Sequence, residues 1–187
     1  IVSRQGFASR ERLLKIEFGA TWRKIHGTQW SMFLISFFVY MVFAYRNHLL
    51  GDFAILNGDE PHYVIVTKSI VQDKDVFLEN NYSNPGPEVK QWPYDWHVVW
   101  GAGNHAYSGH EIGLPLLMAP FYMVAGVFGT KIMMCLLQSL VNVFIYKLCR
   151  NQVGEGVSVV TSLLFAFATV LLIYSNALYP EVPMALI

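Results

Sequence analysis

The run WSMFLISFFVYMVFAY, from Trp30 to Tyr45, carries no charged residue and is rich in Phe, Met, Val and Ile. An uncharged apolar segment of this kind is typical of a membrane-spanning helix, and its aromatic ends suit the two membrane interfaces. We therefore expect a first transmembrane helix over residues 30–46. At its far end, Arg46 and His48 are expected to reach toward the lipid headgroups.

The composition of the whole chain also indicates a membrane protein. Of its 187 residues, 54% are hydrophobic and 14% are charged, with 13 basic residues balanced by 13 acidic ones. Charge is too sparse for an ordinary soluble domain. A net charge of zero argues against nucleic acid as a partner, because nucleic-acid binding needs a basic face. The chain begins at Ile1 without Met and stops at Ile187 inside an apolar run, so we expect it to be part of a longer protein.

Residues 1–29 precede the first span and are rich in Arg and Lys. We expect an amphipathic helix here, lying either on a membrane surface, with its cations against anionic headgroups, or in solvent. Lys and Arg are enriched on the cytoplasmic side of membrane proteins. The N-terminus is therefore expected in the cytoplasm, and the first span leads outward.

Residues 47–111 form a long polar segment, which this orientation places outside the cytoplasm. Within it lies the sequence NGDEPHY, residues 57–63, in which Gly58 frees a turn and Pro61 suits the first turn of a helix. Apolar residues continue at helical spacing, so we expect an amphipathic helix over residues 60–72. Asp59, just before it, is either an N-cap or a functional carboxylate that accepts a proton, binds a cation or positions a nucleophile.

Aromatic and histidine side chains are interleaved in the second half of this loop: Trp92, Tyr94, Trp96, Trp100, His97, His105 and His110. Amphipathic rings in this arrangement suit either the headgroup layer or a sugar-binding face. With His62, Asp59 and Glu111, the histidines can also assemble a transition-metal site. Their irregular spacing matches no zinc signature, and histidines that only form hydrogen bonds are the other interpretation.

Three further segments follow the loop. Residues 112–129 are apolar but interrupted by Pro and Gly, which indicates a bent span or a re-entrant or interfacial element. Residues 131–149 and 156–178 are expected to be transmembrane helices, the first with inward-facing polar positions such as Asn142. Residues 179–187 then begin a second outer loop, which contains Glu181.

The topology depends on whether residues 112–129 cross the membrane. If they cross, Lys147 and Arg150 lie outside, and Glu181 lies on the opposite side from Asp59. If they do not, the basic pair is cytoplasmic and both acidic residues share the outer face, as the positive-inside rule favours. The expected fold is therefore an all-α membrane protein: three transmembrane helices, a re-entrant or interfacial helical segment, and a long outer loop with an amphipathic helix.

Three short motifs in this order carry a family resemblance. They are Asp59-Glu60-Pro61-His62-Tyr63, then His110-Glu111-Ile112-Gly113-Leu114-Pro115, then Tyr179-Pro180-Glu181. The chain from about residue 30 onward resembles the N-terminal part of the integral-membrane glycosyltransferases of the GT-C type. These include protein O-mannosyltransferases, aminoarabinose transferases and the catalytic subunits of oligosaccharyltransferases. In that family an essential acidic residue follows the first transmembrane helix, and Asp59 matches it.

The resemblance implies transfer of a hexose or pentose from a polyprenyl-phosphate or polyprenyl-diphosphate donor, outside the cytoplasm, at a bacterial inner membrane or its equivalent. Asp59 and its neighbour Glu60 would be catalytic, with Asp59 activating or positioning the acceptor. The substrate-binding residues would be His62, Tyr63, His110, Glu111 and Glu181. In the metal-dependent branches Asp59 and Glu181 would hold a divalent cation, magnesium or manganese. Either Lys131 or a basic residue outside this sequence would serve the donor phosphate.

A non-catalytic alternative remains open. The rival interpretation is a transferase-like membrane subunit that scaffolds a larger complex, since the later spans carry small and polar residues of the kind that pack against other helices. In either case membrane lipids surround it, and other membrane subunits are candidate partners. A transporter is less favoured, because the charged residues of the three expected spans lie only near their ends, at Arg46, Lys131 and Lys147, and none lies in the interior.

Overall fold

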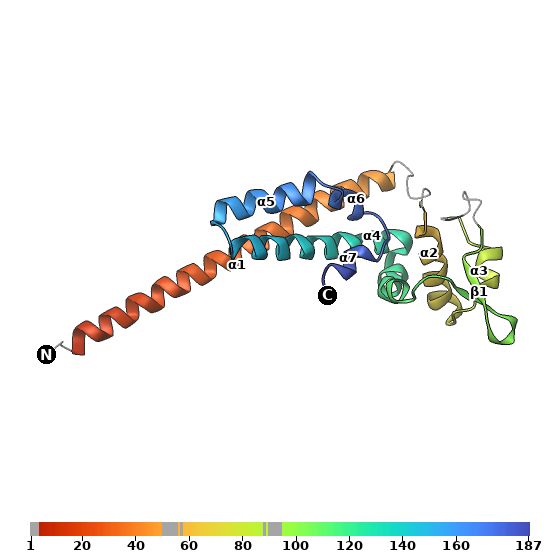
Figure 1. Cartoon of the computed structure of the whole chain (residues 1–187), viewed down its shortest axis with the longest axis horizontal. Coiled ribbons are helices and arrows are strands. Elements are labelled where there is room, and N and C mark those ends of the chain that lie inside the picture. The colour runs from red at the N-terminus through yellow and green to blue at the C-terminus, as the bar shows by residue number, and fades with distance from the viewer. Residues whose placement is uncertain (1–3, 50–55, 57, 88, 90–94) are drawn as a thin grey trace.

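The protein is a predominantly helical molecule, seen here in a computed structural model that describes residues 4–49, 56, 58–87, 89 and 95–187, with side chains from residue 27 onward. The largest elements are the helices α1 (Arg4–Leu49), α4 (Gly113–Arg150) and α5 (Glu155–Phe167), which lie side by side (Figure 1). The shorter elements between α1 and α4 gather beyond one end of this bundle.

The direction of each helix follows from contacts between side chains. At one end of the bundle, Thr28 on α1 donates a hydrogen bond to Glu155 at the start of α5, over 3.0 Å. At the other end, the ring of His48 stacks on Phe128 of α4 with the centroids 5.0 Å apart. The helix α1 therefore runs parallel to α5 and antiparallel to the second part of α4. This arrangement puts the basic C-terminal turn of α4, with Arg150, at the same end as Thr28.

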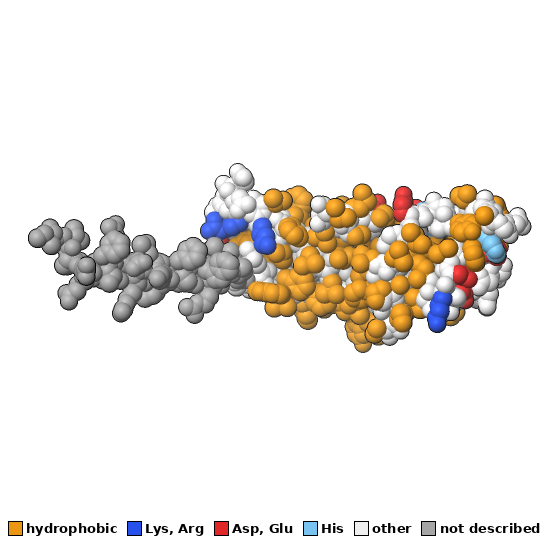
Figure 2. Space-filling model, turned by 90° about the horizontal axis from the view of Figure 1, so that it is seen from below, with side chains coloured by type: hydrophobic (Ala, Val, Ile, Leu, Met, Phe, Trp, Pro, Cys, Tyr) orange, Lys and Arg blue, Asp and Glu red, His pale blue; other side chains and the backbone are white. Residues whose placement is uncertain are grey.

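Among the described residues, two helices are long and apolar enough to cross a membrane: Gly27–Leu49, which is the second half of α1, and Gly113–Arg150. Figure 2 shows the corresponding apolar surface as a broad band along the molecule, with Lys and Arg side chains toward both ends and with His, Asp and Glu side chains visible toward the end away from the N-terminus. The expected span 30–46 lies within the first of these helices. The membrane type and the orientation within it stay predictions.

The helix α4 joins two segments that the sequence separated. Residues 112–129 and 131–149 belong to one element, but it is interrupted at Ala125 and Gly126, whose backbone angles are not helical. Gly126 has φ of +57° and ψ of −142°, a conformation that residues with a Cβ rarely adopt. The two parts of α4 consequently point in different directions (Figure 1). The bend agrees with the expected break in this region, while the re-entrant or interfacial position stays a prediction.

The predicted third span is wrong in its extent. Instead of one helix over residues 156–178, α5 stops at Phe167 after 13 residues, and a separate turn of helix, α6 (Leu171–Tyr174), follows. A 13-residue helix is about 20 Å long, which is short of the roughly 30 Å hydrocarbon layer. Apolar composition alone did not reveal this break. The chain then turns into α7 (Glu181–Met184) beside α4 (Figure 1).

The helix expected after Asp59 is present as α2 (Glu60–Lys68), continued by the π-helical turn η2 (Ser69–Asp73). It is not amphipathic in the expected sense, because every residue from Glu60 to Thr67 is buried. Its apolar side chains belong to the main core, together with residues from the first part of α4 and from the C-terminal turns. The prediction of an amphipathic helix missed these partners, which cover the second face of α2.

A small hairpin departs from the all-α expectation. Strands β1 (Val98–Trp100) and β2 (Ala106–Ser108) pair antiparallel, with Val99 opposite Tyr107, and the turn between them contains the short helix η3 (Ala102–Asn104). Gly103 adopts φ of +74° in that turn. Beside the hairpin lies α3 (Glu79–Ser83), which is joined to it by a hydrogen bond from the Leu78 amide to the Ala106 carbonyl.

Candidate functional site

Asp59 sits at the start of α2, as expected, but it does not behave as a capping residue. Its backbone carbonyl accepts the first helical hydrogen bonds, from the amides of His62 and Tyr63. Its side chain forms no capping bond, however, and is 45% exposed. Since an N-cap works through its side-chain oxygen, the N-cap interpretation does not account for this carboxylate. The side chain is available for other contacts.

The hairpin brings two histidines that are distant in sequence to this carboxylate. His97 directly precedes β1, and His110 comes two residues after β2. At the open end of the hairpin, the Gly109 amide donates to the His97 carbonyl over 2.9 Å, which holds the two flanking segments together. A Cβ at Gly109 would lie 3.1 Å from that same carbonyl oxygen. Strand pairing thus places both imidazoles on one side of the hairpin.

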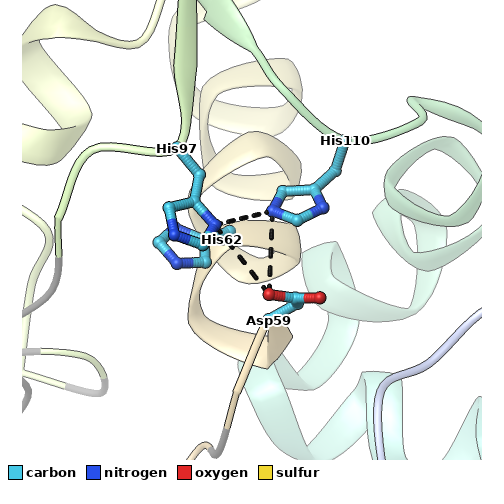
Figure 3. Close-up of side chains that lie close together, drawn as sticks. All are labelled: Asp59, His62, His97 and His110. Atoms are coloured by element: carbon cyan, nitrogen blue, oxygen red, sulfur yellow. Dashed lines mark hydrogen bonds and ion pairs between the residues drawn. The ribbon is translucent and has the colours of Figure 1, made fainter.

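Four side chains converge at this point: Asp59, His62, His97 and His110 (Figure 3). His97 Nδ1 lies 3.0 Å from His110 Nε2. Oδ1 of Asp59 lies 3.8 Å from the same nitrogen of His97 and 3.9 Å from the same nitrogen of His110. One potential ligand atom from each of the four residues lies within 4.8 Å of all the others. We call these four residues the histidine cluster.

His62 is the buried member of the histidine cluster. Its ring stacks on His97 with the centroids 3.9 Å apart, and its Nδ1 lies 2.7 Å from the hydroxyl of Tyr82 on α3. Burial and the neighbouring imidazoles of His97 and His110 lower the pKa of His62 to about 4, against a smaller opposing effect of Asp59. The ring is therefore neutral at pH 7 and keeps a lone pair on one nitrogen.

Glu60 has a different environment from its neighbour. Its side chain is buried, and its Oε1 accepts hydrogen bonds from Lys131 Nζ at 3.0 Å and from the Leu178 amide at 2.6 Å. Lys131 also donates to the carbonyl of Asn176. The pair thus ties the start of α2 to α4 and to the chain before α7. This gives Glu60 and Lys131 a positioning role, while direct catalytic and phosphate-binding roles stay predictions.

Two tyrosines line the space between Asp59 and the C-terminal turns. Tyr63 is buried with its ring 5.2 Å from that of His110. Burial, followed by the negative charges of nearby carboxylates, raises its pKa. Tyr179, two residues before Glu181, also has a raised pKa because of burial and the charges of Glu60 and Asp59. Both hydroxyls consequently stay protonated near neutral pH and can donate hydrogen bonds.

The remaining predicted site residues lie around the histidine cluster rather than in it. Glu111 follows His110 and is exposed. Glu181 begins α7 and lines a separate pocket of about 250 Å³, together with Gln138 and Tyr174. Among the described residues, the potential metal ligands that lie close together include Asp59 but not Glu181. His105 also lies apart, with its Nδ1 3.1 Å from Glu79 and its ring stacked on Phe77.

An aromatic ladder leads from solvent to the histidine cluster. Trp100 stacks on Trp96, with centroids 6.4 Å apart, and Trp96 stacks on Tyr82 at 5.2 Å. The hydroxyl of Tyr82 then contacts His62. Trp100 is 56% exposed and Trp96 is 41% exposed, so part of each indole is open to solvent. Trp92 and Tyr94, which the sequence grouped with them, lie outside the described residues.

Two residues that support the site were not identified from the sequence: Tyr82, which contacts His62, and Glu79, which contacts the hairpin. Glu79 accepts hydrogen bonds from the Ala106 amide at 2.8 Å and contacts His105, so it docks the hairpin onto α3. The segment Glu79-Asn80-Asn81-Tyr82 has no motif that indicates such a role. The turn residues between the strands, Gly101 and Gly103 with Asn104, were the available signal for the hairpin, and through it for the meeting of His97 with His110.

Comparison of the chain with protein-family models, with curated proteins and with solved structures gave no match.

Proposed function

We propose that the chain is the N-terminal part of a membrane glycosyltransferase of the GT-C type, which transfers a sugar from a polyprenyl-phosphate donor to an acceptor outside the cytoplasm. The observation that carries this proposal is the placement of Asp59. Its carboxylate is partly exposed, forms no helix cap, and lies beyond the apolar bundle, at the end opposite the basic turn of α4. A donor whose lipid tail lies in the membrane would present its phosphate near this level.

The chemistry assigned to Asp59 is that of a base or positioning group. The acceptor hydroxyl gives its proton toward the carboxylate, and its oxygen bonds to the anomeric carbon of the sugar. The bond from that carbon to the phosphate oxygen breaks, and the polyprenyl phosphate leaves with the bonding electrons. A half-exposed carboxylate can reach an incoming hydroxyl, and positioned acid or base groups contribute about 10²–10⁴-fold to such reactions.

Two neighbouring features support this assignment. The buried Glu60–Lys131 pair fixes the residue next to Asp59 against α4, which limits how far the carboxylate can move. The aromatic ladder leaves Trp96 and Trp100 partly exposed, and amphipathic aromatic rings suit contact with a sugar that has one apolar face. Both features would place the sugar and the acceptor beside the same carboxylate.

The proposal is tested in the full-length protein, reconstituted into liposomes with radiolabelled undecaprenyl-phosphate hexoses and pentoses. Asp59→Asn keeps the size of the side chain but removes its charge and basicity, so we expect donor consumption to fall at least about 100-fold. Asp95→Asn is the matched control, since Asp95 is an exposed carboxylate of the same loop, two residues before His97. Its donor consumption should stay at the wild-type level.

Retained turnover in Asp59→Asn would contradict the role of this residue. A wild-type protein that consumes none of these donors would contradict the transferase proposal itself. If that inactive protein also purifies with a fixed membrane partner, the scaffold interpretation replaces it. Monodisperse size-exclusion profiles of both variants, matching the wild type, exclude misfolding as the cause of a loss.

A further inference from the structure

We propose that the histidine cluster, formed by Asp59, His62, His97 and His110, binds a divalent transition-metal ion of the zinc type. The site needs no substrate, and its evidence is separate from that for the transferase proposal. The ion would bind Oδ1 of Asp59, the oxygen that faces His97 and His110, which leaves Oδ2 of the same carboxylate for an acceptor. It also differs from the magnesium or manganese site that the sequence suggested at Asp59 and Glu181, because three nitrogen donors replace the second carboxylate.

The spacing of three ligand atoms supports this site. The separations of 3.0, 3.8 and 3.9 Å all join the same atoms: His97 Nδ1, His110 Nε2 and Asp59 Oδ1. A point equidistant from a triangle with these sides lies about 2.1 Å from each atom, which matches the zinc–nitrogen and zinc–oxygen bond lengths of about 2.0–2.2 Å. An ion can therefore bind all three without rearrangement of the backbone.

His62 supplies the fourth ligand. It offers one ring nitrogen within 4.8 Å of the other three ligand atoms, and it is the buried residue of the set. The hydroxyl of Tyr82 lies 2.7 Å from Nδ1 and can accept its proton, which leaves the lone pair on Nε2. Metal-binding histidines characteristically donate their second nitrogen to such an outer partner, which fixes the ring and its tautomer.

The donor set decides the class of ion. Imidazole nitrogen suits zinc and neighbouring transition metals, whereas magnesium and manganese prefer carboxylate, carbonyl and water oxygen. One carboxylate also leaves a net charge of +1 on a bound dication, which favours an anionic group such as phosphate as an additional ligand. His97 and Asp59 are each 45% exposed, so an ion can enter from solvent.

The test uses the full-length protein, purified in detergent with an affinity tag that contains no histidine, stripped with chelator and dialysed against zinc in excess magnesium. We expect one zinc ion per chain by mass spectrometry of the metal. Replacing a ligand, in Asp59→Asn, His97→Ala or His110→Ala, should weaken zinc affinity at least about tenfold, and Tyr82→Phe should weaken it by about 10-fold through the outer partner. X-ray absorption at the zinc edge should show imidazole scattering in the wild type.

The matched control is His105→Ala, which removes a histidine of the same hairpin that contacts Glu79 instead of the cluster. Its zinc stoichiometry and affinity should equal those of the wild type. Far less than one zinc per chain in the wild type, an absorption spectrum without imidazole, or equal losses in His105→Ala would overturn the site. Displacement of zinc by equimolar magnesium or manganese would overturn the choice of ion.

The X-ray absorption measurement needs only the wild type, so the proposal stays testable if a variant does not fold. Zinc stoichiometry is measured without donor or acceptor. A protein that binds zinc but transfers no sugar therefore refutes only the transferase proposal, and an active protein without zinc refutes only this site.

Discussion

The ammonium of Lys131 lies 3.0 Å from Oε1 of Glu60, and both side chains are largely removed from solvent, at 13% and 5% exposure. Removing one partner of a buried ion pair leaves the other charge without compensation, and this costs more than the pair contributes when intact. The consequences for stability can be tested by replacing the two residues separately and together.

Glu60→Gln should lower the free energy of unfolding by about 3 kcal/mol, because the amide keeps an oxygen for the Leu178 amide but leaves the lysine charge unbalanced. Lys131→Met should cost a similar amount. The double variant Glu60→Gln/Lys131→Met should lose less unfolding free energy than the two single variants lose together, because it leaves neither charge buried alone. Denaturant unfolding in detergent measures the unfolding free energy of the wild type and the three variants. Strictly additive losses would show that the two charges do not interact.

The hydrogen bond from Asn142 on α4 to Ser36 on α1 should contribute modestly to helix packing. Such bonds between membrane helices average about 0.6 kcal/mol in double-mutant cycles, with a maximum near 1.7. We expect a coupling energy in this range for Asn142→Ala and Ser36→Ala. The cycle is measured from the unfolding free energies of the four proteins, and a coupling energy of zero would contradict the contact.

Gly58 should resist substitution for two separate reasons. Its φ of +56° is unfavourable for residues with a Cβ, and a Cβ there would lie 2.6 Å from the hydroxyl oxygen of Tyr179. Gly58→Ala should therefore cost about 1 kcal/mol from the backbone alone, and more from the clash. In the background of Tyr179→Phe, which lacks that oxygen, the cost of Gly58→Ala should be smaller. Equal costs in both backgrounds, measured by thermal unfolding, would exclude the clash.

The docking of the hairpin should weaken in acid. Hydrogen bonds from the backbone amides of Glu79 itself and of Ala106 lower the pKa of the Glu79 carboxyl below its ordinary value of 4.5. A lowered pKa in the folded state means that the stabilisation is present above pH 4.5 and is lost as the pH falls through the folded pKa. The protection of the Ala106 amide against hydrogen exchange should drop in that range. Glu79→Gln should remove this dependence, and an unchanged pH profile in the variant would assign it to another group.

Much of the helical framework could be predicted from local sequence signals. The uncharged run after Trp30 lies in a long helix, and the turn chemistry of Gly58 and Pro61 placed the start of α2 directly after Asp59. These features depend on residues close together in the chain, so periodicity and turn preferences reveal them. The end of α5 at Phe167 was not located, because apolar composition continues through it. A bend within residues 112–129 was expected from their Pro and Gly residues, but several such residues occur there and none of them alone marked Gly126 as its position.

The sequence predicted which histidines were candidate ligands, but it did not show which of them form the histidine cluster. The sequence offered His62, His97, His105 and His110 without a spacing that separates ligands from bystanders. The strand register of the hairpin decides which histidines meet, because it brings His97 and His110 together and places His105 against Glu79. Such a pairing is tertiary information, and no local pattern around any single histidine contains it.

The contact between Glu60 and Lys131 can also be understood as a noncovalent clasp, which closes a loop of 71 residues. The entropy of closing a loop grows only with the logarithm of its length, so doubling the loop adds about 0.6 kcal/mol. Insertions and deletions in the exposed connections of the enclosed segment should therefore cost little, provided that they spare α2, α3, the hairpin and the first part of α4. The ends of the loop stay fixed at the bundle, and the exposed segments between them can differ in length and sequence without loosening this contact.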